Sequence, residues 1–314
     1  MTSEVSKMPS SPSILIVGTG ALACWFAGRF AAAGSAVTML GTWPEGMAAL
    51  REKGVTLVDS RGKAQSYPVR VVADPQDCPN LELALVLVKA WQTERAARQL
   101  RVCLPSQGQV LSLQNGLGNL QLLAEFIAGE RVHQGITTVG GTLVAPGRVR
   151  SGGEGTISLA NIPQLVSFAR LFEQAGFAVE KTNNIEALIW GKLAVNAAIN
   201  PLTAILGVPN GALLIQPESR KLMAGAAAEV AAVAAALRIW LPFEDVGAAV
   251  AAVAQRTAGN HSSMLQDMQR GAPTEIEAIN GAVVRVGRQA GVPTPVNETL
   301  SMLVKALVAT KNQK

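Results

Sequence analysis

The chain has 314 residues, a length that favours two domains, each large enough to bury its own core. Hydrophobic residues make up 49% of it and charged residues 16%, which is typical of a soluble globular protein. The net charge of +5 is spread along the chain without basic runs, and aromatic residues are few, so nucleic-acid binding has little support. A modest positive balance suits an enzyme that handles phosphates and carboxylates.

Cysteine and histidine usage excludes two further classes of protein. The three cysteines are widely spaced and the chain has two histidines, which argues against a disulfide framework and against a metal centre. We therefore expect a reducing, cytoplasmic setting and no metal. Residues 1–12 lack the apolar stretch of a signal peptide and are predicted to be a disordered extension. Residues 222–237 are mainly alanine and include Glu229, which favours a buried helix over a membrane span.

In the first half of the chain, strand and helix signals alternate. The apolar run 14–17 stops at Gly18, as a buried parallel strand does. The pattern then predicts a helix at 21–33, a strand at 36–40, a helix at 47–53, a strand at 83–88, a helix at 93–100 and a strand at 110–113. This alternation predicts an α/β fold, a Rossmann-like doubly wound sheet covered by helices.

From about residue 184 the strand signals fade and helical patterns replace them. Helices are expected at 184–199, 218–240, 243–258, 275–290 and 297–310, with prolines between them. The chain is therefore divided into the extension 1–12, a dinucleotide-binding domain 13–183 and an all-helical substrate domain 184–314.

A glycine-rich turn joins the first strand to the first helix, with the sequence Gly18-Thr19-Gly20-Ala21-Leu22-Ala23. The first glycine allows the tight turn, the second lets the backbone approach a pyrophosphate, and Ala23 still permits close helix–strand packing. The helix N-terminus offers N–H groups and a positive dipole to phosphates. The turn predicts dinucleotide binding, against the simpler alternative of an ordinary glycine turn.

The end of the second strand normally selects the cofactor, with an acid for NAD or an arginine for NADP. Here the residues are Gly41-Thr42-Trp43, which match neither pattern. Thr42 can bond a ribose hydroxyl or a phosphate oxygen, and Trp43 can cover the adenine. A cation elsewhere, for example Arg51, could compensate, so the sequence favours NADP slightly and leaves NAD open.

Lys89 and Asn115 follow two of the predicted strands and should lie at the carboxyl edge of the sheet, where ligands bind in such folds. The alternative for each is an ordinary surface loop position. The glycines after Asn115 keep its backbone open, which strengthens its case.

Lys192, Asn196 and Asn200 are spaced by four residues and therefore share one stripe of a helix that is otherwise apolar. One ammonium with two amides can hold a small oxygen-rich molecule and give it a proton. The alternative is a solvated polar face on a buried helix.

A second group of polar residues lies within positions 260–277. Thr274 and Glu277 match a capping box, which leaves Glu275 free in the first turn of the helix that follows. An ionised Glu275 near Lys192 would keep the lysine protonated and oriented. A glutamate that only complements the helix dipole is the competing interpretation.

Together these motifs resemble the ketopantoate reductase (2-dehydropantoate 2-reductase) family over about residues 13–310. The resemblance is carried by the fingerprint turn, by Val-Lys-Ala-Trp-Gln at 88–92 and by Gln-Asn-Gly-Leu-Gly at 114–118. It continues through the long block 190–204, Pro-Asn-Gly at 209–211, Asn-His-Ser-Ser-Met-Leu-Gln-Asp at 260–267 and Thr-Glu-Ile at 274–276.

The resemblance implies hydride transfer from NADPH to a keto acid, 2-dehydropantoate, to give (R)-pantoate on the route to coenzyme A. It implies Lys192 as proton donor with Glu275 beside it. It places the substrate on Asn115, Asn196, Asn200, Asn210, Asn260 and Ser263, and the cofactor on Gly18 to Ala23, Lys89, Asn115, Gly141 and Glu275. The sequence itself adds Thr42 to the cofactor residues. The family's usual arginine at or next to position 41 is missing from this chain.

Two other functions stay open from the sequence. A related enzyme could reduce another 2-keto or 3-hydroxy acid, and a nucleotide-sensing protein could have lost catalysis. Retention of both Lys192 and Glu275 argues against the second. Neither a nucleic-acid nor a membrane partner is expected, and a homodimer is left open.

Overall fold

A computed structural model describes residues 13–311, so the predicted extension at residues 1–12 lies outside the described residues. The chain forms two compact units. Unit 1 contains the described residues up to Val88 together with Gln92–Gln114 and Leu120–Asn183. Unit 2 contains Lys89–Trp91, Asn115–Asn119 and the chain from Asn184 onward. Two short segments that follow strands of unit 1 therefore pack with unit 2.

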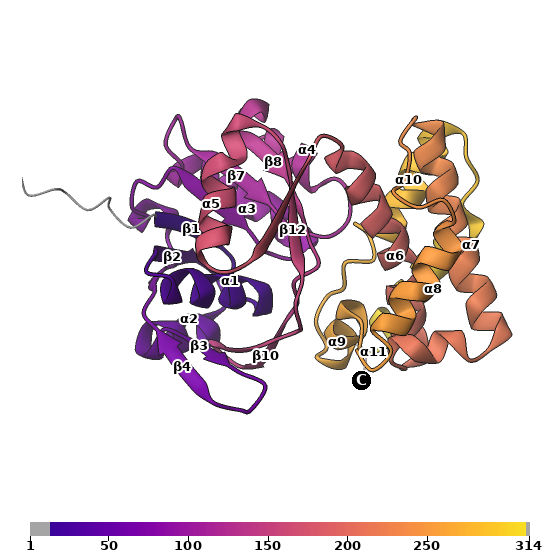
Figure 1. Ribbon diagram of the computed structural model, residues 1–314, viewed down its shortest axis with the longest axis horizontal. Coiled ribbons are helices and arrows are strands. Elements are labelled where there is room, and N and C mark those ends of the chain that lie inside the picture. Colours follow the sequence, from indigo (N-terminus) through magenta and orange to yellow (C-terminus); the bar gives the residue numbers. More distant parts are fainter. Residues whose placement is uncertain (1–12, 312–314) are drawn as a thin grey trace, which may run out of the picture. The chain divides into compact units, whose positions relative to one another are not determined.

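A six-stranded parallel sheet forms the centre of unit 1 (Figure 1). Its order is β5-β2-β1-β6-β7-β8. This is the order of dinucleotide-binding folds, in which the first strands of the two halves, here β1 and β6, lie side by side. The strands are β1 (Ser13–Val17), β2 (Ala36–Leu40), β5 (Arg70–Val72), β6 (Leu83–Val86), β7 (Gln109–Ser112) and β8 (Val132–Gln134). Ligands in such sheets bind outside the carboxyl ends of the strands where the order reverses, here at β1 and β6.

Two smaller sheets complete unit 1. One has the order β10-β11-β3-β4 and the other the order β13-β12-β9. Their strands are β3 (Val55–Val58), β4 (Ala64–Tyr67), β9 (Ile136–Thr137), β10 (Gly141–Ala145), β11 (Arg148–Ser151), β12 (Thr156–Ala160) and β13 (Ala178–Thr182). The sequence prediction missed all seven strands. They are short, and most of them contain too few alternating apolar residues to give a clear strand pattern.

Helices before Asn184 are α1 (Ala21–Ala32), α2 (Pro44–Lys53), α3 (Thr93–Cys103), α4 (Asn119–Ala124) and α5 (Val166–Gln174). Short 3-10 helices lie at η1 (Pro75–Asp77), η2 (Ala90–Gln92), η3 (Gly129–Arg131), η4 (Pro163–Leu165) and, later in the chain, η5 (Asn210–Leu214). The middle of helix α1 is buried, and Phe26 and Phe30 pack against Phe172 and Phe177 with ring centroids 4.8–6.2 Å apart. The core therefore fixes the helix whose N-terminus follows the glycine turn.

Unit 2 is helical in its main part from Asn184 onward. Its helices are α6 (Ile185–Leu206), α7 (Pro217–Ala236), α8 (Val246–Arg256), α9 (Ser263–Gln269), α10 (Asn280–Ala290) and α11 (Pro295–Lys311). Helix α6 is the core helix: Trp190, Leu193, Ala194 and Ala197 are buried in one apolar cluster. Of the described helices it alone is long and apolar enough to cross a membrane by composition, but 67% of its apolar window is buried inside the fold.

Helix α6 continues through Pro201, where the sequence pattern predicted an end near residue 199. Proline has no N–H, so the carbonyl four residues earlier, that of Ala197, loses its helical partner. The buried Asn280 side chain supplies the missing donor, with Nδ2 2.9 Å from that carbonyl oxygen. The same amide donates to Asn297 Oδ1 at 2.9 Å, and Asn297 donates to Glu229. Tertiary hydrogen bonds thus allow a proline that local preference disfavours.

The capping box predicted at Thr274–Glu277 is wrong. Helix α10 begins at Asn280, and residues 275–279 form a turn in which Ala278 N and Ile279 N both donate to Glu275 O at 3.1 Å. The Ala278 carbonyl accepts from Leu117 N at 2.9 Å, which holds this turn out of the helix. Glu277 is exposed and pairs with Arg285 and Lys305. Glu275 is therefore placed by a turn and not by a helix N-terminus.

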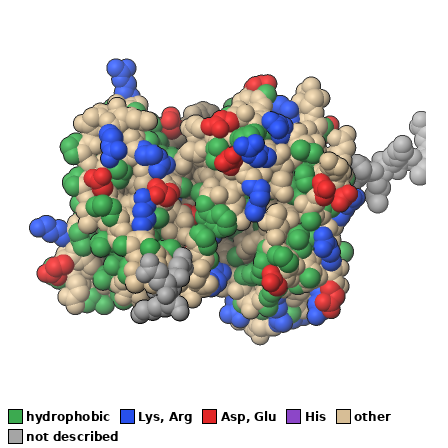
Figure 2. All heavy atoms as spheres, turned by 180° about the vertical axis from the view of Figure 1, so that it is seen from behind, with side chains coloured by type: hydrophobic (Ala, Val, Ile, Leu, Met, Phe, Trp, Pro, Cys, Tyr) green, Lys and Arg blue, Asp and Glu red, His purple; other side chains and the backbone are tan. Residues whose placement is uncertain are grey.

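Charged side chains of both signs are interspersed over the face shown in Figure 2. This agrees with a net charge of +5 distributed along the sequence.

Candidate functional site

The glycine turn of unit 1 has the geometry that a pyrophosphate requires. Gly18 has φ of +132°, which L side chains rarely adopt, and an added Cβ would lie 3.3 Å from the Leu87 carbonyl group. Gly20 is the N-cap of α1, makes no side-chain cap hydrogen bond, and an added Cβ would meet open space. The first-turn N–H groups of α1 therefore stay available to a phosphate, and the residues present fit a dinucleotide.

Gly141, the first residue of β10, lies against the same helix start. An added Cβ there would be 3.2 Å from Ala21 O and 3.3 Å from Trp25 Cβ. Ala23 is fully buried, whereas Ala21 and Leu22 are half-buried. The predicted cofactor residues of the turn and Gly141 are thus brought together within unit 1.

The chain after β2 has an exposed Thr42, and Trp43 is the N-cap of α2. Trp43 packs its ring over Gly46. Arg51, the cation considered as a compensating group, lies in the last turn of α2 and its Nε is 3.5 Å from Val71 O. Its guanidinium is thus directed at the backbone of β5.

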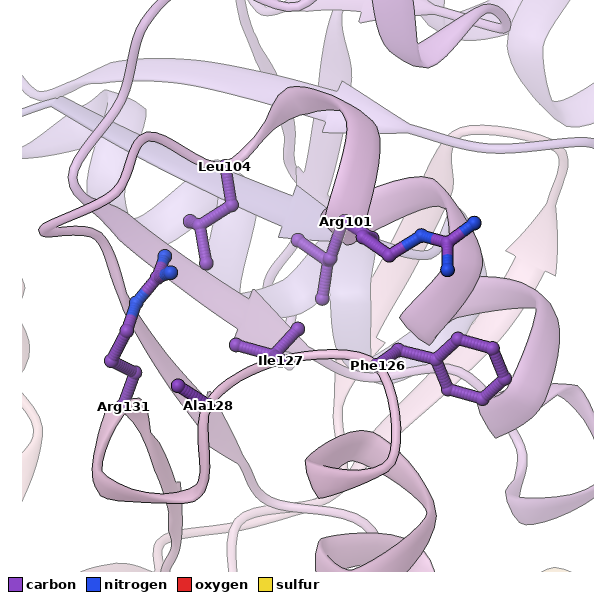
Figure 3. A pocket seen from close by; sticks show the side chains of 7 residues that line it. Arg101, Leu104, Phe126, Ile127, Ala128 and Arg131 are labelled. Carbon is purple, nitrogen blue, oxygen red and sulfur yellow. The ribbon is translucent and has the colours of Figure 1, made fainter.

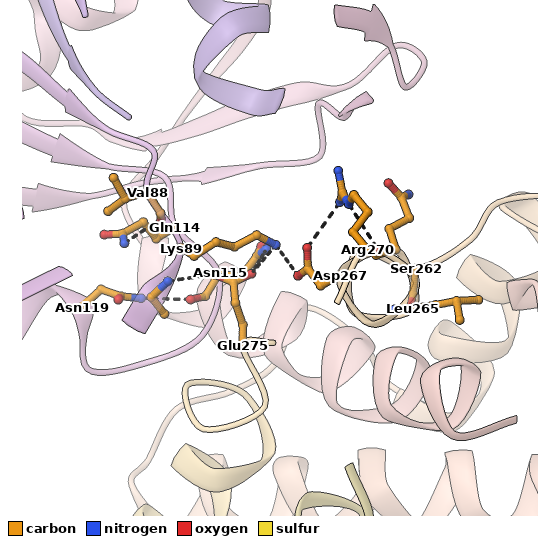
Figure 4. Close-up of polar contacts among 12 residues, drawn as sticks. Val88, Lys89, Gln114, Asn115, Asn119, Ser262, Leu265, Asp267, Arg270 and Glu275 are labelled. Atoms are coloured by element: carbon orange, nitrogen blue, oxygen red, sulfur yellow. Dashed lines mark hydrogen bonds and ion pairs between the residues drawn. The ribbon is translucent and has the colours of Figure 1, made fainter. Parts of the chain in front are cut away.

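A cluster of charged side chains forms in unit 2 around two buried carboxylates (Figure 4). Lys89 Nζ lies 2.6 Å from Asp267 Oδ2 and 3.6 Å from Glu275 Oε2. Arg270 approaches Asp267 from the other side at 3.3 Å. Burial raises the pKa of the Asp267 carboxyl, and the Lys89 ammonium opposes this by favouring the charged form.

Glu275 is held by three groups from two loops. The backbone N of Ala90 donates to Oε1 at 3.0 Å, Asn115 Nδ2 donates to Oε2 at 3.3 Å, and Lys89 lies beside the same oxygen. Glycine is required next to Asn115, because a Cβ on Gly116 would overlap the Ala278 backbone and because its φ is +81°. The loop after β7 and the turn that carries Glu275 therefore fit closely together.

Lys192 is half-buried on α6 and interacts with Glu275. Burial lowers the pKa of the Lys192 ammonium from 10.5 to about 8, and the charge of Glu275 acts in the opposite direction. An ammonium with a pKa near neutrality can hold and release a proton under ordinary conditions. Asn196 lies one turn further along α6, is half-buried, and makes no side-chain hydrogen bond to the described residues.

The remaining predicted substrate residues lie in two groups of unit 2. Asn210 N donates to Asn260 O at 3.0 Å, and Asn210 Nδ2 donates to Thr257 Oγ1 at 2.9 Å. Among the described side chains the buried Asn210 Oδ1 is an acceptor with no partner. Ser263 opens α9, and Asn200 is buried on α6, three residues before Thr203. Thr203 Oγ1 contacts Ser262 Oγ at 2.7 Å and thereby ties α6 to the start of α9.

Sequence reasoning missed Asp267 and Ser262. Ser262 is the N-cap of α9, because its Oγ accepts from Leu265 N at 3.1 Å. Asp267 lies four residues after Ser263, so both face the same way on α9, and this spacing is the signal that could have found it. Asn280 was also missed, since its role depends on a proline 79 positions earlier in the sequence.

A separate cavity of about 90 Å³ lies near the end of α3 (Figure 3). It is lined by Leu100, Arg101, Leu104, Phe126, Ile127, Ala128 and Arg131. Arg131 donates to the carbonyls of Pro105 and Gly108, and Arg101 lies over the Phe126 ring at 5.9 Å. Both arginines thus have structural roles, and none of the predicted site residues lines this cavity.

A dinucleotide turn in one unit and a half-buried lysine beside a carboxylate in the other define a class, the nicotinamide-dependent oxidoreductases. The family model "Ketopantoate reductase PanE/ApbA" matches residues 14–164, and "Ketopantoate reductase PanE/ApbA C terminal" matches residues 184–308. The chain belongs to the ketopantoate reductase family. It is an NAD(P)H-dependent oxidoreductase, and the family confirms both the resemblance and the Rossmann-like fold predicted from the sequence.

Individual relatives support this membership over nearly the whole chain. The 2-dehydropantoate 2-reductase of Halobacterium salinarum is 37% identical over 298 residues, covering 93% of this chain and 97% of the relative. A ketopantoate reductase of the PanE/ApbA family from Ralstonia eutropha superposes with a TM-score of 0.89 at 31% identity, covering 96% and 99% of the two chains. A D-mandelate dehydrogenase solved with NADH and anilino(oxo)acetate superposes with a TM-score of 0.90 at 28% identity, with the same coverage.

Proposed function

We propose that this chain reduces 2-dehydropantoate to (R)-pantoate, with Lys192 as the proton donor, in pantothenate and coenzyme A biosynthesis. The observation that carries the proposal is the lowered pKa of Lys192, about 8, together with its interaction with Glu275. The bound nicotinamide cofactor supplies the hydride to C2 of the keto acid. Negative charge then develops on the carbonyl oxygen, where an ammonium stabilises it before giving up its proton.

Glu275 orients Lys192 and favours its protonated form, because its charge raises the lysine pKa. The carboxylate is itself held by Ala90 N and Asn115, so the pair is preorganised. Asn196 and Ser263 offer neutral hydrogen-bonding groups, and we assign them to the substrate's carboxylate and hydroxyl groups. Asn200, Asn210 and Asn260 are assigned to the same substrate.

The charges of the cluster suit a monoanionic keto acid. With Lys192 protonated, the cations are Lys89, Lys192 and Arg270 and the anions are Asp267 and Glu275, which leaves one net positive charge. A substrate with one carboxylate would neutralise it. Opposite charges attract, so this positive balance supports a carboxylate-bearing ligand.

A second candidate is the reduction of an aromatic 2-keto acid. The likeness to a D-mandelate dehydrogenase that holds NADH and anilino(oxo)acetate favours it. The chemistry at Lys192 would be the same, and only the group beyond the keto acid would differ.

The test is to incubate the purified chain with each reduced cofactor and either 2-dehydropantoate or phenylglyoxylate, and to follow the loss of nicotinamide absorbance. Rapid turnover of 2-dehydropantoate, lost in Lys192→Ala, supports the proposal. Turnover of phenylglyoxylate alone supports the second candidate. If neither acid is reduced although the cofactor binds, the proposed function is wrong.

A further inference from the structure

The turn after β2 bears on which nicotinamide cofactor the chain takes. Gly41 follows β2 directly, and its N–H donates to Val72 O at 3.2 Å. Val17 and Leu40 are paired in the sheet, so Gly41 stands level with Gly18 of the fingerprint turn. In dinucleotide-binding folds the residue about 20 positions after the glycine motif recognises the 2′ position of the adenosine ribose. Positions 41 and 42 are therefore the ones that distinguish the 2′-hydroxyl of NADH from the 2′-phosphate of NADPH.

Gly41 is a glycine because it has no room for a side chain. Its φ is not in the left-handed region, so its backbone does not require glycine. An ideal Cβ at Gly41 would overlap Thr19 Cγ2 and lie 3.0 Å from Thr19 Oγ1. Thr19 is 6% exposed and β-branched, so it cannot turn aside freely. Any side chain at position 41 must displace a residue of the fingerprint turn itself.

The neighbouring sequence offers no cation in place of an arginine at position 41. Residues 30–50 contain neither lysine nor arginine. Of the two arginines that flank them, Arg29 donates to Ala175 O at 2.6 Å, and Arg51 is directed at Val71 O. Glu45 adds a negative charge to the first turn of α2, which offsets the attraction of that helix end for a phosphate.

We infer that this chain selects NADH over NADPH because Thr19 leaves no room for a side chain, and so for an arginine, at position 41. A ribose hydroxyl needs only a neutral partner, and the exposed Thr42 supplies one. A 2′-phosphate needs a cation, for which an arginine would be the usual residue. The inference rests on the proposed function in one respect only: it takes the bound cofactor to be a nicotinamide dinucleotide. It departs from the sequence's slight preference for NADP, which depended on compensation by Arg51.

A double-mutant cycle tests the inference through cofactor binding alone. Dissociation constants for NADH and NADPH are measured by nicotinamide fluorescence, without keto acid, in the wild type, Gly41→Arg, Thr19→Ser and the double variant. Thr19→Ser removes Cγ2, the atom that overlaps, and keeps the hydroxyl. We expect the wild type to bind NADH at least about tenfold more tightly than NADPH. Gly41→Arg alone should weaken both cofactors, and adding Thr19→Ser should restore binding with NADPH now preferred.

Thr42→Arg is the matched control, since the side chain at position 42 is exposed, whereas position 41 is buried against Thr19. It should gain affinity for NADPH by the same factor whether residue 19 is threonine or serine. If Gly41→Arg does not fold, Gly41→Ala places the same Cβ against Thr19. It should weaken NADH binding, which Thr19→Ser should restore.

Two results would overturn the inference. One is a wild type that binds NADPH as tightly as NADH or more tightly. The other is an effect of Gly41→Arg, or of Gly41→Ala, that does not depend on residue 19. Neither result bears on whether the chain reduces a keto acid, and an inactive chain that still prefers NADH would overturn only the proposed function.

Discussion

The fingerprint turn of unit 1 and the charged cluster of unit 2 are built in different ways. The turn uses the backbone of six consecutive residues, and its requirements are small side chains and a φ of +132° at Gly18. The cluster uses side chains from positions 89, 115, 192, 267 and 275, which only the folded chain brings together. A cofactor site of the first kind tolerates few substitutions at glycine, whereas a site of the second kind depends on each charge having its partner.

The largest expected effect lies in the cluster. Lys192→Ala should lower the turnover number for keto-acid reduction by about 10²–10⁴-fold, because a positioned proton donor contributes about that much. Binding of the reduced cofactor to unit 1, followed by fluorescence, should stay nearly unchanged. Lys181→Ala, which removes an exposed lysine, is the control and should leave turnover intact. Near-normal turnover in Lys192→Ala would remove the lysine from the mechanism.

The next effect concerns α6, the helix that carries Lys192. Asn280→Ala leaves the Ala197 carbonyl without a donor in a fully buried place, so the free energy of unfolding should fall by about 1–3 kcal/mol or more. Denaturant unfolding of this variant, compared with the exposed Asn80→Ala, measures the difference. Equal stabilities would show that Pro201 is accommodated without Asn280.

The third effect concerns uncharged residues that we assign to the substrate, whose substitution should weaken the binding of the keto acid. Asn196→Ala and Ser263→Ala should each weaken keto-acid binding by about 1–3 kcal/mol if a buried substrate group loses its partner. The measurement is the KM and the inhibition constant of the product, with the exposed Ser106→Ala as control. Unchanged values in both variants would show that the substrate binds elsewhere.

The smallest effect is a shift along the pH axis. Glu275 raises the pKa of Lys192 against the effect of burial. Glu275→Gln should therefore move the falling limb of the pH–rate profile for reduction to lower pH. A limb that moves upward, or does not move, would show that this carboxylate does not act on the lysine.

The same contrast explains how much could be predicted from the sequence. The turn, α1 and four strands of the parallel sheet depend on local patterns and were predicted closely, whereas the short strands β5 and β8 of that sheet were missed. Lys192, Asn196 and Asn200 could be proposed as site residues because their spacing is also local. Asp267 was missed since its partner Lys89 is 178 residues away, and the helix through Pro201 was cut short since Asn280 completes it. The predicted capping box failed because Leu117, from another loop, holds the 275–279 turn.

The most direct test of the central claim is the pH dependence of a single turnover of keto-acid reduction, with saturating cofactor, in the wild type and in Lys192→Ala. Reduction requires the ammonium, and the pKa of Lys192 is about 8. The wild-type rate should therefore be constant well below pH 8 and fall with a slope of one above it, and Lys192→Ala should be slow at every pH without that limb. A wild-type rate that does not fall above pH 8, or a limb that persists in Lys192→Ala, would contradict the assignment of Lys192 as the proton donor.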